Sequence, residues 1–104
     1  DFQYQDKIEI GHLIFYPQQN KIIHQGKDIF LTGKEAALLY LLIQNQGKTV
    51  KTKDILQKVW RANPGFHSNV VQATIHRLRE KTEFIKPPLV HNVHGIGYRF
   101  SVEK

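Results

Sequence analysis

The sequence has 104 residues and contains neither cysteine nor methionine. Without cysteine, neither a disulfide framework nor a thiolate metal site can form, and this absence is typical of proteins from a reducing compartment. No apolar run approaches the roughly 18 residues that a membrane-spanning helix needs. The first residues, Asp1 to Tyr4, lack the charged and apolar regions of a signal peptide. The sequence therefore predicts a soluble cytoplasmic protein, and a start at Asp1 in a chain without methionine indicates a fragment or a processed product.

Recognisable catalytic and metal-binding patterns are also missing. None of the six histidines belongs to a His-x-x-x-His pair beside a carboxylate on a predicted helix. No glycine-rich phosphate loop follows a predicted strand, and no nucleophile stands in an elbow or triad pattern. The sequence therefore predicts a protein that is not an enzyme and that has neither a metal site nor a cofactor.

Charge is distributed unevenly along the chain. Fifteen Lys and Arg residues outnumber nine Asp and Glu residues, and the isoelectric point is near 9.7, which favours a polyanionic partner. Residues 1–47 hold four lysines against five acidic residues, whereas residues 48–104 hold eleven basic residues against four acidic ones. A charge excess that served solubility alone would be spread evenly, so the second half is predicted to meet the anion.

Residues 8–31 alternate short apolar stretches with turn signals at Gly11-His12, Pro17 to Asn20 and Gln25-Gly26. This pattern predicts a four-stranded antiparallel meander. Such a sheet buries one face only, so a layer of helices must cover that face. The residues predicted to point inward are Ile8, Ile10, Leu13, Phe15, Ile22, Ile29 and Leu31.

The first helix is predicted at about 33–46. Thr32 and Glu35 can form a capping box, in which each side chain bonds the backbone N–H of the other residue. Gly47 is expected to end the helix in a left-handed conformation. A broad apolar stripe indicates a core helix, and it consists of Leu38, Leu39, Leu41, Leu42 and Ile43.

A second, shorter helix is predicted at about 53–61, with Thr52 as its cap. Its apolar residues Ile55, Leu56 and Val59 recur at helical spacing, and Asn63-Pro64-Gly65 ends the segment. A third helix is predicted at about 69–83, where Ser68 or Asn69 can cap. The inward face of the third helix, at 100° per residue, consists of Val71, Thr74, Ile75, Leu78 and Thr82.

Two further strands at about 89–102 follow the break at Pro87-Pro88 and are joined by the glycine-rich tip from His94 to Gly97. A four-stranded sheet, three helices and a terminal hairpin give the outline of a winged helix-turn-helix, an α+β fold. The whole chain, residues 1–104, is expected to be one domain.

The outward face of the third helix carries the side-chain types that read base edges. It consists of Asn69, Gln72, Ala73, His76 and Glu80, with Arg77 and Arg79 on its flanks. Arginine suits guanine, Asn and Gln suit adenine, and a small apolar side chain suits the thymine methyl group. Any surface helix shows polar residues, however, so composition leaves this interpretation open.

Four motifs in order carry a resemblance to a known family. They are Leu31-Thr32-x-x-Glu35-x-x-Leu38-Leu39, Lys53-x-x-Leu56-x-x-Val59-Trp60, Val71-x-x-x-Ile75-x-Arg77-Leu78-Arg79-x-Lys81 and Val93-x-Gly95-x-Gly97-Tyr98-Arg99-Phe100. Together they resemble the C-terminal effector domain of OmpR/PhoB-type response regulators, over about residues 8–102. The resemblance implies sequence-specific binding of duplex DNA as the output domain of a bacterial two-component transcriptional regulator.

By the same resemblance, the third helix lies in the major groove and the hairpin is a wing near the minor groove. Arg77 matches a family position that reads bases, and Ala73 one that makes apolar base contacts. Lys53 and Trp60 resemble the family's phosphate contacts, which fix register without reading sequence. Further positions that resemble DNA contacts are Asn69, Gln72, His76, Arg79 and Tyr98.

Two of these residues have alternative roles that the sequence leaves open. Trp60 can instead be a core aromatic that closes the second helix, and Arg79 can form an ion pair with Glu35 rather than contact a phosphate.

Three positions depart from the family pattern. The family commonly has Phe after the capping-box glutamate, whereas this chain has Ala36, which leaves core volume that Tyr40 is a candidate to fill. His94 stands where the family often has Arg before the first wing glycine, and it is a weaker, pH-dependent cation. Glu80 stands where a basic residue is frequent, so DNA contact within the third helix is predicted to stop near Arg77.

The resemblance also implies partners other than DNA. They are a second copy bound in tandem, RNA polymerase through the loop at residues 61–67, an N-terminal receiver domain and its cognate histidine kinase. A different class of function, docking of the basic surface on an acidic protein, stays open because this fold also serves protein contact. RNA binding is less favoured, because no aromatic pair marks a base-stacking sheet.

Overall fold

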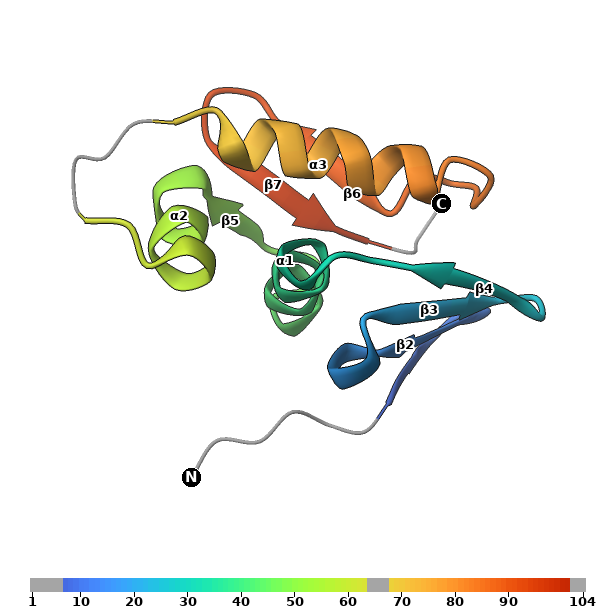
Figure 1. The fold of residues 1–104 in the computed structure, drawn as a ribbon. Coiled ribbons are helices and arrows are strands. Elements are labelled where there is room, and N and C mark those ends of the chain that lie inside the picture. Colours follow the sequence, from blue (N-terminus) through green and yellow to red (C-terminus); the bar gives the residue numbers. More distant parts are fainter. Residues whose placement is uncertain (1–6, 64–67, 102–104) are drawn as a thin grey trace.

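The computed structural model describes residues 7–63 and 68–101 (Figure 1). Within these ranges no helix is long and apolar enough to cross a bilayer. In chain order the elements are β1 (Ile8–Ile10), β2 (Leu13–Tyr16), the 3-10 helix η1 (Pro17–Gln19), β3 (Lys21–His24), β4 (Lys27–Phe30), α1 (Gly33–Gln44), β5 (Thr49–Lys51), α2 (Thr52–Trp60), α3 (Val70–Lys81), β6 (Val90–Val93) and β7 (Gly97–Phe100).

The first four strands form a sheet of order β1-β2-β3-β4, in which each strand pairs antiparallel with the next. One row across this sheet joins Phe15, Ile22 and Ile29, and all three side chains are buried. The predicted meander and its inward face are therefore confirmed. The other predicted inward residues are buried, as for Leu13 and Leu31, or partly buried against the same core, as for Ile8 and Ile10.

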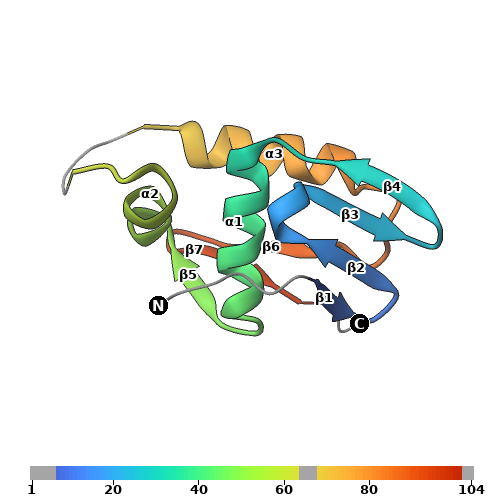
Figure 2. The same cartoon turned by 60° about the horizontal axis from the view of Figure 1, so that its bottom comes forward.

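Helix α1 begins with the predicted capping box. The backbone N–H of Glu35 donates to Thr32 Oγ1 at 3.1 Å, and the backbone N–H of Thr32 donates to Glu35 Oε1 at 2.9 Å. The helix lies at the centre of the fold (Figure 2). The N-terminal sheet packs on one side of it and α2 on the other, while α3 and β7 also contact it. Because neighbouring elements surround α1, most of its side chains are buried, including nearly all of its apolar stripe.

The end of α1 differs from the prediction. The helix ends at Gln44, and Asn45 Nδ2 donates to the Leu41 carbonyl at 2.9 Å. Gly47 has the expected positive φ of 83°, but it lies in the turn beyond the helix, where its N–H donates to the Phe100 carbonyl at 3.0 Å. The expectation that Gly47 stops the helix was therefore wrong. The helix ends before Gly47, where the Asn45 side chain bonds the Leu41 carbonyl of the last turn.

A short strand, β5, stands where the sequence predicted none, and it changes the start of α2. Thr52 is the first residue of α2 rather than its cap, and the side chain of the cap residue, Lys51, makes no capping bond. The Thr52 N–H instead donates to the Ile96 carbonyl at 3.2 Å. The predicted Thr52 cap was thus wrong, because Thr52 lies inside the first turn, where its own backbone N–H is one of the free donors of the helix start and bonds to the hairpin tip.

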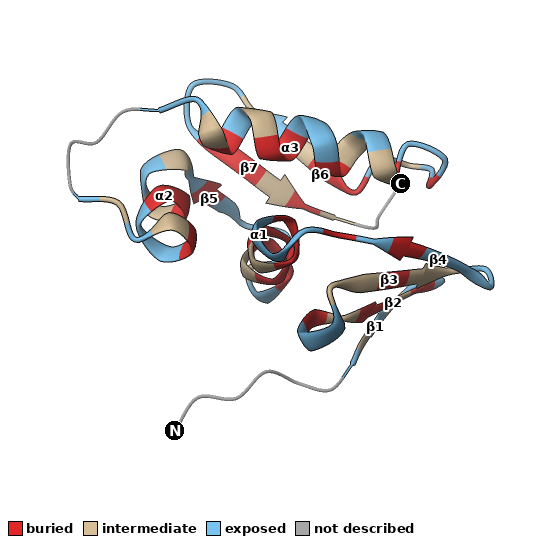
Figure 3. Cartoon of the chain, in the orientation of Figure 1, coloured by how far each residue is buried: buried red, intermediate tan, exposed pale blue. Residues whose placement is uncertain are grey.

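Helix α3 is close to its predicted span and buries the predicted face, which consists of Val71, Thr74, Ile75 and Leu78, with Thr82 just beyond its end. Of the two possible caps, Ser68 makes the bond: its Oγ accepts the Val70 N–H at 3.1 Å. The Asn69 side chain makes no capping bond. The opposite side of α3 is exposed (Figure 3).

The terminal hairpin is confirmed as β6 and β7, but β7 is the middle strand of a sheet of order β5-β7-β6. Val50 of β5 pairs with Tyr98, and Lys51 pairs with Gly97. A Cβ atom on Gly97 would lie 2.0 Å from the Val50 carbonyl oxygen. Glycine at this position therefore permits the close approach of β5, and the hairpin is joined to the start of α2.

Ala36 and Tyr40 lie side by side in the structure, as the departure at Ala36 suggested. Both are buried. A hollow nevertheless remains beside them, bounded by η1 and the start of α1 and lined in part by Pro17, Asn20 and Gly33. Tyr40 is thus buried beside Ala36, but its side chain does not fill the hollow between η1 and the start of α1.

We expect Gly97→Ala to destabilise the domain, because β5 would have to move away from β7 to admit the methyl group. Overpacking of this kind costs about 1–3 kcal/mol, and urea denaturation would measure the loss in the free energy of unfolding. Gly33→Ala is the matched control, because a Cβ atom there meets nothing within 4 Å and alanine favours a helix. An equal loss in the two variants would contradict the close-approach explanation.

Candidate nucleic-acid interface

The exposed face of α3 carries most of the predicted contact residues. Asn69, Gln72, His76 and Arg77 are exposed, and Ala73 is half-buried between them. None of them belongs to the buried stripe, and the side of α3 opposite that stripe is exposed (Figure 3). Arg77 lies at the flank of this face, as predicted, and reaches Glu35 from there. His76 Nε2 lies 3.3 Å from Glu80 Oε2, one turn further along the helix. The Glu80 carboxylate on this face is therefore paired with a side chain of the same helix.

The hairpin tip lies beside the start of α3 and the start of α2. One hollow lies among Thr52, Gln72, Tyr98 and the tip, residues 93–97. A second hollow lies between residues 51–53 and the tip residues Gly95 and Ile96. The structure therefore brings the predicted residues Lys53, Gln72 and His94 together around one end of the molecule, with Lys53 and His94 both exposed.

Two of the predicted phosphate-contact residues are less exposed than the others. The Tyr98 side chain is only 7% exposed, because it lies in the middle strand of the hairpin sheet. Trp60 is half-buried and packs against the core, with the Lys34 ammonium 5.9 Å from its ring centroid. Its position fits the alternative role of an aromatic that closes α2, and its contact with a phosphate stays a prediction.

Arg79 does not form the ion pair with Glu35 that the sequence left open. Its guanidinium donates to the Val90 carbonyl, at 3.1 Å from Nη2 and 3.4 Å from Nε, and to Asn92 Oδ1. The ion-pair interpretation was wrong because residue 79 lies about 200° around the helix from residue 77. Arg79 therefore joins α3 to β6, while other cations reach Glu35.

Glu35 is fully buried and is paired with two cations from α3. Lys81 Nζ donates to Oε1 at 2.6 Å, and Arg77 Nε lies 3.6 Å from Oε2. Burial by itself raises the pKa of the Glu35 carboxyl. The hydrogen bonds from Lys81 and the Thr32 backbone, together with the charges of Lys81 and Arg77, lower this pKa by more than burial raises it. The net pKa lies below the ordinary value of 4.5, so this carboxyl is ionised at neutral pH.

Sequence reasoning missed this arrangement and the residues that β5 brings to the interface. The sequence placed Glu35 in the capping box and left open an ion pair with Arg79, but it did not predict that Arg77 and Lys81 are the cations that pair with this buried carboxylate. Lys51 and Thr52 line the hollows at the hairpin tip, and the strand that places them is too short to give a period-two signal.

The segment between α2 and α3 is only partly described. Residues 61–63 lie next to Trp60 and, with Ser68 and Val70, border an open hollow. Residues 64–67 of the predicted polymerase-contact loop lie outside the described residues.

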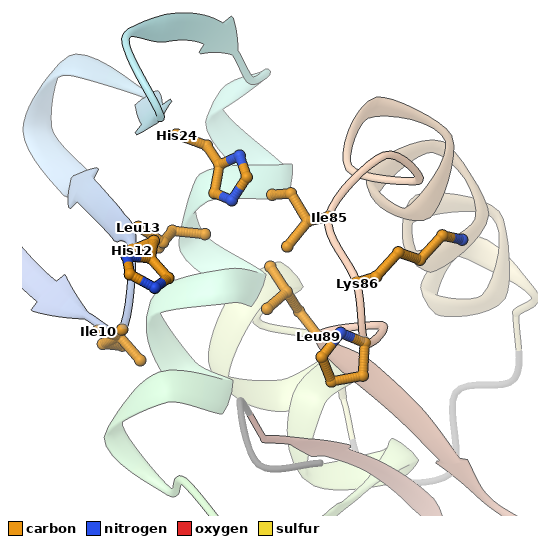
Figure 4. Close-up of a pocket in the computed structure, with 9 residues that line it drawn as sticks. Ile10, His12, Leu13, His24, Ile85, Lys86 and Leu89 are labelled. Atoms are coloured by element: carbon orange, nitrogen blue, oxygen red, sulfur yellow. The ribbon is translucent and has the colours of Figure 1, made fainter.

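A separate hollow of about 100 Å³ lies between the β1–β2 turn, the end of β3 and the segment that follows α3 (Figure 4). Ligand pockets usually measure about 300 Å³ or more. Within residues 7–63 and 68–101, no group of three His, Asp or Glu side chains could hold a metal ion. None of the predicted site residues lines this hollow. Its labelled lining consists of Ile10, His12, Leu13, His24, Ile85, Lys86 and Leu89.

Known proteins resemble this chain in sequence and in structure. Residues 26–100 match the family model described as "Transcriptional regulatory protein, C terminal". The transcriptional activator protein IrlR of Burkholderia pseudomallei is 40% identical over 85 residues, which cover 81% of this chain and 37% of IrlR. The chain thus spans little more than a third of this relative.

Solved structures match over nearly the whole chain. The DNA-binding domain of CpxR from E. coli has a TM-score of 0.81 at 28% identity, covering 91% of this chain and 95% of that domain. The Klebsiella pneumoniae RstA DNA-binding domain, solved in complex with the RstA box, has a TM-score of 0.82 at 21% identity. This second match covers 93% of this chain and 98% of that domain, and its likeness concerns the fold alone.

We expect Glu35→Gln to lower the free energy of unfolding at neutral pH by about 1–3 kcal/mol, because hydrogen bonds to a charged group are lost. Since the folded pKa of Glu35 lies below the ordinary 4.5, this contribution is present above pH 4.5 and disappears as the pH falls through the folded pKa. Urea denaturation of both proteins over a pH series would measure the difference.

Glu9→Gln is the control for this series. Glu9 is exposed and pairs with Lys7 at 3.3 Å, and such surface pairs contribute little to stability. A difference between wild type and Glu35→Gln that stayed constant from neutral to acidic pH would contradict the assignment.

Proposed function

Because the chain belongs to the family of C-terminal domains of transcriptional regulatory proteins, the OmpR/PhoB type that its motifs resemble, we propose that it binds duplex DNA sequence-specifically. It does so as the output domain of a two-component response regulator. The observation that carries this proposal is the uncovered face of α3, which stands beside the hairpin tip, where Lys51 and Lys53 are also exposed. Had the N-terminal sheet covered these side chains, helix α3 could not enter a groove.

Helix α3 supplies the base-reading surface in this proposal. Arg77 is assigned to guanine, and Asn69 and Gln72 to adenine, because these side chains match the donor and acceptor pattern of those bases in the major groove. Ala73 makes an apolar contact, and His76 lies within the same face. The wide major groove of B-form DNA admits an α-helix, so α3 enters there while the hairpin is the wing near the minor groove.

Phosphate contacts anchor the domain on either side of that groove. Lys53 is exposed at the start of α2, where an ammonium group neutralises a phosphate and releases a counterion. Trp60 and Tyr98 are the further candidates, and His94 at the tip stands nearest to the minor groove. Arg79 is assigned mainly to holding the wing, because its guanidinium is engaged by Val90 and Asn92.

Other partners follow from the family. The chain is a cytoplasmic module without enzymatic activity, and two copies bind in tandem on their DNA site. The loop at residues 61–67 contacts RNA polymerase. In the full-length regulator an N-terminal receiver domain and its cognate histidine kinase control this output domain.

Selection of bound sites from a random-sequence duplex library tests the proposal. We expect the chain to enrich a short sequence and to bind it with a strong dependence on salt. A module that docks on an acidic protein would enrich no sequence and would show little salt dependence with DNA, and that outcome would contradict DNA recognition.

Arg77→Ala should weaken binding to the enriched duplex by about 1–3 kcal/mol and relax the preference at one base pair, as expected for loss of a specific base contact. Mobility-shift titrations of the enriched duplex and of its single-base-pair variants would measure both effects. An unrelated duplex serves as the internal control, because only the loss of one charge affects it. Equal weakening on every duplex would contradict base reading by Arg77.

Lys53→Ala should instead weaken binding to all duplexes alike and reduce the slope of log affinity against log salt by about 1. The matched control is Lys7→Ala, which removes the same charge from the N-terminal sheet, where Lys7 pairs with Glu9. We expect the control to leave the slope unchanged. A changed base preference with an unchanged slope in Lys53→Ala would contradict a phosphate contact.

A further inference from the structure

We propose that the buried Glu35 carboxylate is a positioning residue for DNA recognition: together with Thr74 it holds the Arg77 guanidinium in the orientation from which Arg77 reads a base. Glu35 lies in α1, below the surface, and acts only through Arg77. This inference rests on the proposed function and assigns a specificity role to a residue that the sequence linked only to helix capping and to an ion pair with Arg79.

Arg77 is held from the protein side by two buried groups. Its Nε lies 3.6 Å from Glu35 Oε2, and its Nη2 donates to Thr74 Oγ1 at 3.3 Å. The Thr74 hydroxyl itself donates to the Val70 carbonyl at 2.8 Å, which fixes the direction in which it accepts. Both supporting residues belong to the core, with Glu35 0% and Thr74 1% exposed.

The Glu35 side of this contact is also constrained. Oε1 accepts from Lys81 and from the Thr32 backbone, whereas the buried Oε2 has no hydrogen-bond partner among the described residues. The Arg77 charge at 3.6 Å is therefore what compensates Oε2. A buried carboxylate oxygen without compensation is costly, so the two side chains are held together.

The rest of the Arg77 side chain remains available to a ligand. The side chain is 52% exposed, and a guanidinium has five N–H donors in a rigid planar fork. Nε and Nη2 point to the protein, which leaves further donors for a base. A long side chain whose orientation is set before binding loses less conformational freedom on binding, and bidentate recognition depends on that orientation.

Lys81 provides a contrast on the same helix. It makes the shorter contact with Glu35, at 2.6 Å, but it lies one turn beyond Arg77 and outside the predicted contact face. Lys81 thus contributes to the same buried ion cluster without reading a base. Its removal should affect stability and general attraction to DNA, and it should leave base preference alone.

The test measures affinity for the duplex that wild type enriches from the random library, and for each of its single-base-pair variants. Arg77→Ala first identifies the base pair that Arg77 reads. Glu35→Gln keeps an acceptor for the capping box and removes the charge. We expect it to lower discrimination at that same base pair by about threefold or more, with discrimination at the other positions unchanged.

Thr74→Val removes the second support and leaves Glu35 in place. Because, among the described residues, the Thr74 hydroxyl bonds only to its own helix and to Arg77, the variant should fold with little loss of stability. We expect a smaller loss of discrimination, confined to the same base pair. This variant also decides the question if Glu35→Gln proves too unstable to measure.

Lys81→Met is the matched control, because it breaks the other cation contact of Glu35. We expect uniform weakening on all duplexes and an unchanged pattern of discrimination. Adding Glu35→Gln to Arg77→Ala should cost no further discrimination at the shared base pair, since Glu35 acts only through Arg77.

Three outcomes would overturn the inference. One is full discrimination in both Glu35→Gln and Thr74→Val when Arg77→Ala has lost it, and another is a uniform loss that matches Lys81→Met. The third is a gain in discrimination, which would mean that Glu35 holds Arg77 away from DNA. If wild type enriches no sequence at all, the proposed function itself fails, and the positioning role fails with it.

Discussion

A single buried carboxylate constrains how the three helices are arranged. Glu35 is fully buried at the start of α1, and its charge must be compensated because an isolated carboxylate in a protein interior is costly. The cations that compensate it, Arg77 and Lys81, stand one turn apart on α3. Helix α3 must therefore cross the start of α1 with that side turned toward Glu35. This rotation buries the apolar stripe of α3 and leaves Asn69, Gln72 and His76 facing outward.

The same rotation connects α3 to the wing. With Arg77 turned toward α1, Arg79 faces β6 and donates to the Val90 carbonyl and to Asn92. The hairpin tip is joined in turn to α2 through the bond between the Thr52 N–H and the Ile96 carbonyl. Recognition helix, wing and α2 are thus connected by polar bonds at both ends of the hairpin. A groove-reading surface made of separate elements needs such connections to present one fixed shape.

Local signals in the sequence predicted those parts of the fold that local forces determine. The capping box at Thr32, the stripe of α3 and the meander follow from neighbouring residues, and the structure confirms them. Features that depend on distant partners were missed or wrong. Strand β5 can pair with β7 because Gly97 has no side chain to block the β5 backbone. Arg79 donates to β6, whereas Arg77 and Lys81 are the residues that pair with Glu35. In the candidate site, the exposure of the outward face of α3 was predictable, whereas the burial of Tyr98 and the partners of each cation were not.

The uneven charge along the sequence becomes an uneven charge in space. The first half of the chain, with a slight acidic excess, builds the N-terminal sheet and α1, whereas the second half, with most of the cations, builds α2, α3 and the wing. Figure 1 shows α2, α3 and the hairpin beside and above α1 and the N-terminal sheet below it, so the basic elements gather on one side of the molecule. A polyanion is attracted to that side over distances of about a Debye length, whereas base reading needs contact at a few ångströms. General attraction and specific reading therefore arise from different residues, and Glu35 belongs to the second process although it never reaches the surface.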